Sequence, residues 1–238
     1  MNDETHRKKH YFSAFELALW LGSLALIGVA FVLWDRVNFL TLCASLIGVT
    51  SLIFCAKGNP VGQALIIVFA VLYGVISWMQ AYYGEVITYV GMSAPMAVYA
   101  LVAWLKNPYK GNRAEVKINV LRGREYLLMF LLAAAVTVAF YFILQAFHTA
   151  NLIPSTVSVT TSFIAVYLTA RRSPFYALGY AANDIVLVVL WSLAAVNDLS
   201  ALSVVICFAV FLVNDVYGFV NWMRMRRRQA VAEETARG

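Results

Sequence analysis

Residues 183–191 have the sequence Asn-Asp-Ile-Val-Leu-Val-Val-Leu-Trp, and residues 214–222 have the sequence Asn-Asp-Val-Tyr-Gly-Phe-Val-Asn-Trp. Each stretch places an amide and a carboxylate inside a long apolar run. A carboxylate near the middle of a membrane helix costs at least about 2.5 kcal/mol, so it normally faces a water-filled cavity or a partner. The fold must therefore surround these two Asn-Asp pairs with other helices, and the pairs are the first candidates for a functional site.

The composition of the whole chain is that of a membrane protein. Of its 238 residues, 62% are hydrophobic and 13% are charged, whereas soluble domains are about 45–50% apolar. The net charge of +6 comes from short basic runs between apolar stretches; such runs set orientation in a bilayer and predict no nucleic-acid partner. The three cysteines lack CxxC spacing and the three histidines lack ligand spacing, so we expect neither a metal site nor a cofactor.

A helix needs about 20 mostly apolar residues to cross the hydrocarbon of a bilayer. The first apolar stretch is too long for the core of a signal peptide, so we expect it to be retained. The sequence predicts an all-α polytopic membrane protein with eight transmembrane helices. Their predicted bounds are Ala14–Trp34, Phe39–Ala56, Val61–Tyr83, Val86–Leu105, Tyr126–Phe147, Ser155–Ala170, Phe175–Ala195 and Ala201–Trp222.

Lysines and arginines are distributed unequally between the two sides of these spans. Alternating the spans places 17 of them on the side of both termini, including six between Lys106 and Arg124, and leaves only Arg36 on the other side. Because Lys and Arg resist translocation, the asymmetry predicts that both termini are cytoplasmic. It also supports the number of spans, since a missed or extra helix would have mixed the two groups.

Spans two to four resemble spans six to eight. Three matched positions lie at similar offsets of 114, 113 and 118 residues: Pro60 and Pro174, Trp78 and Trp191, and Trp104 and Trp222. A single span separates the two units, so both enter the membrane from the same face. The pattern predicts two parallel three-helix repeats joined by a linker helix, with an extra N-terminal helix outside them.

This organisation divides the chain into five parts. The predicted parts are a cytoplasmic tail with a peripheral first helix (1–36), a first repeat (37–105), a basic cytoplasmic loop with the linker helix (106–150), a second repeat (151–223) and a basic cytoplasmic tail (224–238). We expect the basic loop to be a solvated linker whose charge serves topology. The end of the tail is polar enough to be disordered.

Helical spacing collects polar side chains into stripes on spans seven and eight. These spans are adjacent and antiparallel, so their stripes could line one cavity. The alternative is that the amides only join helices, through hydrogen bonds worth about 0.6 kcal/mol on average. A carboxylate is a costly way to join helices, which favours a functional role for the aspartates. The candidate substrate contacts are Asn183, Asp184 and Trp191 in one stripe and Asn214, Asp215 and Tyr217 in the other.

The first repeat contributes further aromatic and amide candidates, Tyr73, Trp78 and Gln80, whose alternative role is helix packing. We expect Glu85 to be a solvated turn residue and Pro95 to kink the fourth span. No lysine lies deep in a span, there is no Walker A sequence, and no histidine lies at membrane depth. These features exclude a retinal Schiff base, ATP hydrolysis and a Ser-His-Asp hydrolase in turn, and we expect no catalytic residues.

Several motifs, taken in order, resemble those of the PnuC family of vitamin-precursor transporters, and the likeness covers spans two to eight. The motifs are Tyr83-Gly84-Glu85, Pro95-Met96, Trp104, Asn183-Asp184 with Trp191, Asn214-Asp215-Val216-Tyr217-Gly218 and Trp222-Met223-Arg224. Their order and spacing carry the resemblance, because no single motif is specific. Phe69 departs from the pattern, since many relatives have Asn there, but an aromatic ring at this position could stack on a pyridine ring.

The resemblance implies a SWEET-like fold in the bacterial inner membrane. It also implies that the chain passes nicotinamide riboside by facilitated diffusion, that cytoplasmic phosphorylation then traps the substrate, and that the protein is a homo-oligomer, with a trimer as the expected form. Aromatic planes can hold the cationic ring through about 0.5–2 kcal/mol of cation–π attraction, and amides can pair with its carboxamide and hydroxyls.

Other functions stay open at this point. Thiamine is also a cationic heteroaromatic and would suit the same residues. A non-transporting membrane sensor or assembly subunit would use the Asn-Asp pairs as interhelical contacts. A membrane enzyme is the third class, and the lack of an identifiable nucleophile–base pair argues against it.

Overall fold

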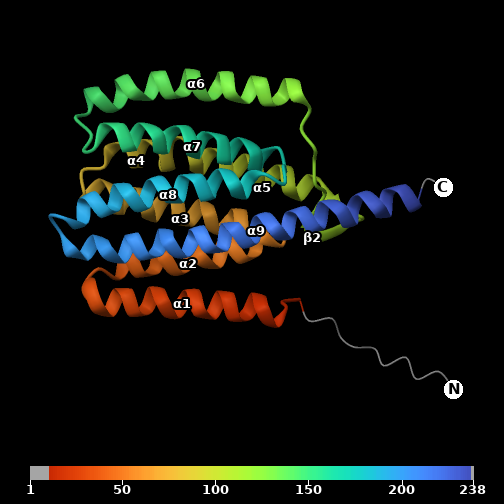
Figure 1. Ribbon diagram of the computed structural model, residues 1–238, viewed down its shortest axis with the longest axis horizontal. Coiled ribbons are helices and arrows are strands. Elements are labelled where there is room, and N and C mark those ends of the chain that lie inside the picture. Colours follow the sequence, from red (N-terminus) through yellow and green to blue (C-terminus); the bar gives the residue numbers. More distant parts are fainter. Residues whose placement is uncertain (1–10, 237–238) are drawn as a thin grey trace.

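The computed structural model describes residues 11–236, and its helices pack side by side in one bundle (Figure 1). The tail residues Arg7, Lys8, Lys9 and Arg237, whose side of the membrane was predicted, lie outside this range. Within it, eight helical segments are long and apolar enough to cross a membrane, which confirms the predicted fold class. They are α1 (Ala14–Trp34), α2 (Phe39–Ala56), α3 (Pro60–Met79), the fourth span (Tyr83–Lys106), α6 (Gly123–Ala146), α7 (Leu152–Ala170), α8 (Tyr176–Ala195) and the eighth span (Leu199–Thr235).

The fourth span is not a uniform α-helix. It consists of α4 (Tyr83–Val86), a π-helical segment η1 (Ile87–Ser93) and α5 (Ala94–Lys106). Pro95 lies in the first turn of α5 and has no backbone N–H to continue the regular hydrogen-bond ladder. The predicted distortion beside Pro95 therefore takes the form of a widened turn, a feature that is frequent at functional sites.

Six of the spans form a closed ring of neighbours. In order around the ring, α2 packs against α3, α3 against α5, α5 against α7, α7 against α8, α8 against α9 (Leu202–Thr235), and α9 against α2. Exchanging α2, α3 and α5 with α7, α8 and α9 leaves this order unchanged. The neighbour pattern supports our interpretation of two repeats whose interfaces are α2–α9 and α5–α7.

The ends of α2 and α7 have the same backbone geometry. Gly58 has φ +68° and Arg172 has φ +57°. The amides of both residues bond to the carbonyl three residues earlier, at Cys55 and Thr169. Each helix thus ends in a left-handed residue of the kind that closes a helix C-terminus, and in each case the next helix begins within a few residues. The turns are 114 positions apart, in agreement with the offset of the prolines that follow them.

The helices α1 and α6 lie outside the ring, on opposite sides of the bundle (Figure 1). The helix α1 packs against α2 and α9, whereas α6 packs against α7. Glu16 of α1 is buried and forms an ion pair with Lys57 at 3.0 Å. Much of the surface of α6 is apolar and exposed, so lipid or a second copy of the chain can cover it, and the homo-oligomer stays a prediction.

The start of α1, the end of α9 and the connection between the two units lie at one end of the bundle (Figure 1). It is here called the basic end because Lys57 and Arg171 cap α2 and α7 there. This connection includes a hairpin of β1 (Pro108–Tyr109) and β2 (Asn112–Val116). Val116 is fully buried and donates its amide to the Gly58 carbonyl at 2.9 Å. The expectation of a purely solvated linker is therefore wrong.

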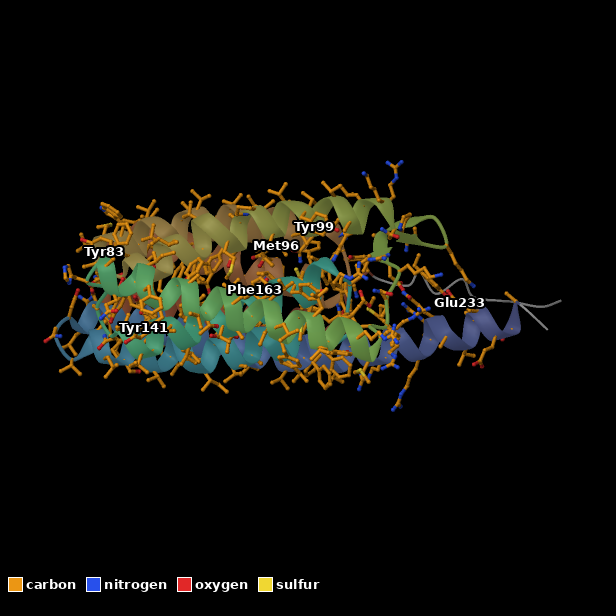
Figure 2. The ribbon with its side chains drawn as sticks, turned by 90° about the horizontal axis from the view of Figure 1, so that it is seen from above. Tyr83, Met96, Tyr99, Tyr141, Phe163 and Glu233 are labelled. Carbon is orange, nitrogen blue, oxygen red and sulfur yellow. The ribbon has the colours of Figure 1, made fainter. Side chains whose placement is uncertain are left out.

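The basic tail predicted to follow residue 223 is helical in its described part. The helix α9 continues to Thr235 and projects beyond the bundle, where Figure 2 shows Glu233. Gln229 of this extension bonds to the amide of Ile118 and to the carbonyl of Val116 in the linker. Disorder was expected for the last residues of the tail; it is wrong for those up to Thr235, which continue α9, and residues 237–238 lie outside the described range.

Candidate functional site

An internal cavity of about 40 Å³ lies inside the six-helix ring. All six spans of the two units contribute to its wall. The lining residues are Ser51, Leu52 and Cys55 from α2, Ile66, Phe69 and Ala70 from α3, Tyr89 and Ser93 from η1, Ser162 from α7, Tyr176, Tyr180 and Asp184 from α8, and Phe208, Phe211 and Asp215 from α9. The wall is thus aromatic on several sides and acidic on one.

The acidic side consists of Asp184 and Asp215, which are each 3% exposed. Their carboxyl groups lie within hydrogen-bonding reach of one another across the α8–α9 interface. The Oδ2 atom of Asp184 has no hydrogen-bond donor among the described residues. A buried carboxylate without a partner is costly, and no Lys, Arg or His side chain lines this cavity. The pair is therefore suited to a positively charged or hydroxyl-bearing ligand.

Asn183 lies directly behind the cavity wall rather than in it. Its Oδ1 accepts hydrogen bonds from Thr161 at 2.8 Å and Ser162 at 3.0 Å, and its Nδ2 donates to the Tyr89 hydroxyl at 3.1 Å. Ser162 and Tyr89 both line the cavity. Asn183 therefore orients two wall residues, and its own bonding capacity is largely used.

Glu85 belongs to the same network, contrary to the expectation of a solvated turn residue. It is fully buried, and its Oε2 accepts a hydrogen bond at 3.3 Å from Ser158, which also lies 3.4 Å from Asn183 Oδ1. The preceding Gly84 is the feature of the sequence that could have indicated this burial. A Cβ atom there would lie 2.9 Å from Leu144 and 3.3 Å from Ser155, so this turn is covered by α6 and α7.

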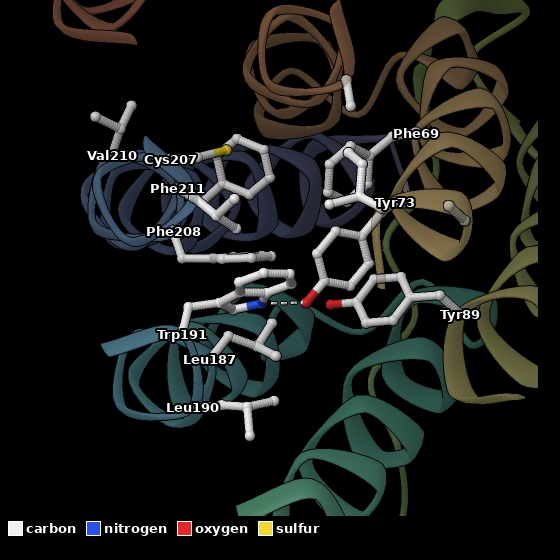
Figure 3. Packing of buried hydrophobic residues seen from close by; sticks show 14 of the residues in the cluster. Phe69, Tyr73, Tyr89, Leu187, Leu190, Trp191, Cys207, Phe208, Val210 and Phe211 are labelled. Atoms are coloured by element: carbon white, nitrogen blue, oxygen red, sulfur yellow. Dashed lines mark hydrogen bonds between the residues drawn. The ribbon is translucent and has the colours of Figure 1, made fainter. Parts of the chain in front are cut away.

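A second layer of aromatic side chains supports the cavity wall. Phe69 lines the cavity and stacks on Tyr73 with ring centroids 5.6 Å apart. The Trp191 indole N–H donates to the Tyr73 hydroxyl at 2.6 Å, and Tyr89 lies against the same tyrosine (Figure 3). Of the predicted aromatic contacts, the structure thus brings Phe69, Tyr73 and Trp191 together.

Four further predicted contacts lie neither in the cavity wall nor in the layer that supports it. Trp78 is 63% exposed and lies against Tyr83, and Gln80 caps the end of α3. The stripe on α9 faces α1: Asn214 donates to the Ser23 hydroxyl at 3.0 Å, and the Tyr217 hydroxyl donates to Glu16 at 2.8 Å.

The position of the extra helix α1 explains why Asn214 and Tyr217 do not line the cavity. Consecutive residues differ by about 100° around an α-helix, so covering Asn214 and Tyr217 with α1 turns Asp215 toward the cavity. Of the amides and carboxylates predicted as substrate contacts on α8 and α9, Asp184 and Asp215 line the cavity, whereas Asn183 and Asn214 do not. The sequence analysis did not identify the wall residues Ser51 of α2 and Ser162 of α7. These side chains are small, and nothing in the sequence distinguishes them from other serines.

Comparison with known proteins agrees with this architecture. The family model described as "Nicotinamide mononucleotide transporter" matches residues 38–224. The chain belongs to this transporter family. The family match begins after α1, which agrees with a helix added outside the ring. Because the family consists of transporters, the expectation that the chain is not an enzyme is confirmed, and the chain is a multi-pass membrane transporter.

Two known proteins are similar to this chain along most of their length. The nicotinamide riboside transporter PnuC of Neisseria mucosa is 26% identical over 227 residues, which are 92% of this chain and 84% of that protein. The crystal structure described as that of the vitamin B3 transporter PnuC superposes with a TM-score of 0.80 at 24% identity, covering 92% of this chain and 94% of that one. The predicted resemblance to the PnuC family is confirmed.

Proposed function

We propose that this chain carries nicotinamide riboside across the bacterial inner membrane by facilitated diffusion, through the cavity inside the six-helix ring. The observation that carries the proposal is the carboxyl pair of Asp184 and Asp215, set among aromatic side chains. The name of the relative from Neisseria mucosa supports the same substrate.

The charge of the pair matches the charge of the substrate. Two carboxyl groups in hydrogen-bond contact away from water share one proton, because two negative charges cannot persist so close together. We infer that the pair keeps one proton and carries a single negative charge when it binds the cation. Nicotinamide riboside carries a single positive charge on its pyridinium ring, and rings such as Phe69 and Tyr89 can take that cation on their faces.

The same cavity disfavours a mononucleotide, although the family description names one. A phosphate monoester brings one to two negative charges at neutral pH, and phosphate sites are typically built from Arg, Lys or backbone amides at helix N-termini. The cavity offers two carboxyl groups and no basic side chain. Charge therefore favours the riboside over its phosphate.

The cavity must widen to accept this cargo. Sites for small organic molecules usually have volumes of about 300–1,000 Å³, whereas this cavity has about 40 Å³. The π-helical segment η1 supplies Tyr89 and Ser93 to the wall, and a segment with irregular hydrogen bonding is a suitable place for such a change.

Facilitated diffusion only equilibrates the substrate, so net uptake needs a sink. We infer that phosphorylation in the cytoplasm provides it, because the phosphorylated product no longer suits the acidic cavity. We assign the basic end to the cytoplasm by the positive-inside rule. The same rule assigns both termini to the cytoplasm.

Flux into proteoliposomes tests the proposal. Purified protein should equilibrate labelled nicotinamide riboside with no ion gradient and no ATP, and unlabelled riboside should compete while its mononucleotide should not. Flux that requires an ion gradient would exclude facilitated diffusion. Equal competition by the mononucleotide would refute the charge argument, and stronger competition by thiamine would make thiamine the substrate.

A further inference from the structure

Three buried aromatic side chains form a layer between the cavity and the basic end. Trp104, Tyr176 and Trp222 have exposures of at most 2%. The Tyr176 and Trp222 rings are 4.6 Å apart, those of Trp104 and Trp222 5.4 Å, and those of Trp104 and Tyr176 6.4 Å. Each ring thus contacts the other two, and together they fill the space between α5, α8 and α9.

The two tryptophans in this layer make crossed hydrogen bonds between the helix units. The Trp104 indole of α5 donates to the Thr169 carbonyl of α7 at 3.0 Å, and the Trp222 indole of α9 donates to the Cys55 carbonyl of α2 at 2.8 Å. Thr169 and Cys55 are 114 positions apart and occupy the same place in the last turns of α7 and α2. Each bond therefore ties one unit to the other.

The layer separates two voids. On its inner side, Cys55 and Tyr176 line the central cavity. On its outer side lies a polar crevice of about 400 Å³ at the basic end, whose lining includes Lys57, Asn221 and Met225. Lys57 follows Cys55 by two positions and Asn221 precedes Trp222. Asn221 and Trp222 donate to the consecutive carbonyls of Ala56 and Cys55, so the layer lies between residues that line the crevice and residues that line the cavity.

The opposite end of the ring is joined in a different way. There the Trp191 indole donates to the Tyr73 hydroxyl at 2.6 Å and the Tyr82 hydroxyl donates to the Leu190 carbonyl at 3.2 Å, whereas Trp78, the counterpart of Trp191 in the first unit, is exposed. Among the described residues, the matched pair of tryptophan-to-carbonyl bonds is therefore found at the basic end.

We propose that Trp104 and Trp222 form the cytoplasmic gate of the transport path, and that the gate opens when the two crossed indole–carbonyl bonds break and the units separate at α2–α9 and α5–α7. The proposal rests on the proposed function only in that a solute passes through the cavity; it does not depend on which solute passes.

Native Cys55 provides a direct test, since it lies in the cavity wall immediately behind the layer. In a Cys43→Ser, Cys207→Ser background, Cys55 is the only thiol. A membrane-impermeant methanethiosulfonate carrying a trimethylammonium group is then applied to inside-out vesicles.

Trp104→Phe and Trp222→Phe keep an aromatic ring and remove the N–H donor. Each should speed labelling of Cys55 about fivefold, the factor expected for the loss of one hydrogen bond of ordinary strength.

Trp20→Phe is the matched control. The Trp20 indole also donates to α2, at the Thr50 hydroxyl 3.2 Å away, but from α1 on the outside of the ring. Its loss should leave the labelling rate unchanged. The proposal is overturned if the Trp104 and Trp222 variants label no faster than this control, or if they label faster from both membrane faces, because the second result indicates general loosening of the bundle.

A second variant keeps the test decisive if a tryptophan variant does not fold. Asn221 donates to the Ala56 carbonyl at 2.7 Å and so joins α9 to α2 beside the layer. Asn221→Ala should also speed labelling from the cytoplasmic face, and an unchanged rate counts against the proposal. Labelling needs no substrate, so a functioning gate together with absent riboside flux would refute the proposed function alone.

Discussion

The carboxyl groups of Asp184 and Asp215 meet across the interface of two neighbouring helices, in a cavity wall that contains no basic side chain. The two residues are 31 positions apart, and the hairpin-like return of α9 along α8 brings them together. The proposed function assigns one shared proton to this pair, which leaves a single negative charge for the cationic substrate.

Removing both carboxyl groups should weaken binding of the cationic substrate far more than removing one. Asp184→Asn or Asp215→Asn replaces one member of the pair with an amide of the same shape and leaves the other carboxyl group to carry the single negative charge, so we expect each single variant to keep most of its affinity. The double variant leaves no carboxyl group in the cavity wall, and we expect at least a tenfold loss of affinity, about 1.4 kcal/mol or more. The two changes are therefore not additive. Calorimetric titration with nicotinamide riboside measures these effects. Asp198→Asn, on an exposed loop, is the control, and equal affinity in the double variant and this control would contradict the charge match.

The hydrogen bond between Trp191 and Tyr73 should contribute to stability. Trp191→Phe leaves the buried Tyr73 hydroxyl without its indole donor, and we expect the free energy of unfolding to fall by about 1–3 kcal/mol. The double variant Trp191→Phe, Tyr73→Phe should cost less than the sum of the two single changes. Unfolding in detergent measures all three, and strict additivity would show that the bond contributes nothing.

The ion pair of Glu16 with Lys57 should matter more than the ion pair on the projecting part of α9. Glu16 is buried, whereas Lys117 and Glu233 are both well exposed. Glu16→Gln leaves a partly buried ammonium without its partner, so it should lower the free energy of unfolding by about 1–3 kcal/mol. Lys117→Gln should change it by less than about 1 kcal/mol. Thermal unfolding of the two variants checks the order, which would be reversed if α1 were only loosely attached.

Stability should depend on the ionisation of Asp35, in the turn between α1 and α2. Burial raises the pKa of this carboxyl, and the hydrogen bond from Ser203 only partly offsets the effect. The contribution of Asp35 to stability is therefore complete below the ordinary pKa of about 3.9 and is lost as the pH rises through the raised value. Asp35→Asn should then raise the melting temperature at pH 7.5, and the gain should disappear near pH 4. A gain that is equal at both pH values would rule out ionisation as its cause.

The sequence predicted the bounds of the helices better than it predicted which face of each helix points toward the cavity. The bounds of α1 and α2 were predicted to the residue, because apolar length and flanking polar residues determine where a membrane helix ends. The direction in which Asn214 points was not predictable, since it depends on α1, which is 180 positions or more away in the chain. A stripe on a membrane helix can face a cavity or another helix, and both environments accept an amide.

The same limit applies to Glu85 and to the linker. A glutamate beside a predicted turn and a basic loop both have the composition of solvated segments. Their burial arises from contacts with α7 and with the extension of α9, which are distant in sequence. Local composition therefore predicted the wrong environment for both.

The small volume of the cavity has a consequence for affinity. If the form described here predominates, only the fraction of molecules that have already widened can accept cargo, and the apparent dissociation constant equals the intrinsic one divided by that fraction. Substitutions that favour the widened form, such as smaller side chains at Leu52 or Phe211 in the wall, would then tighten binding without adding any contact to the cargo. Affinity in this chain would be set as much by the population of an uncommon conformation as by the residues that touch the ligand.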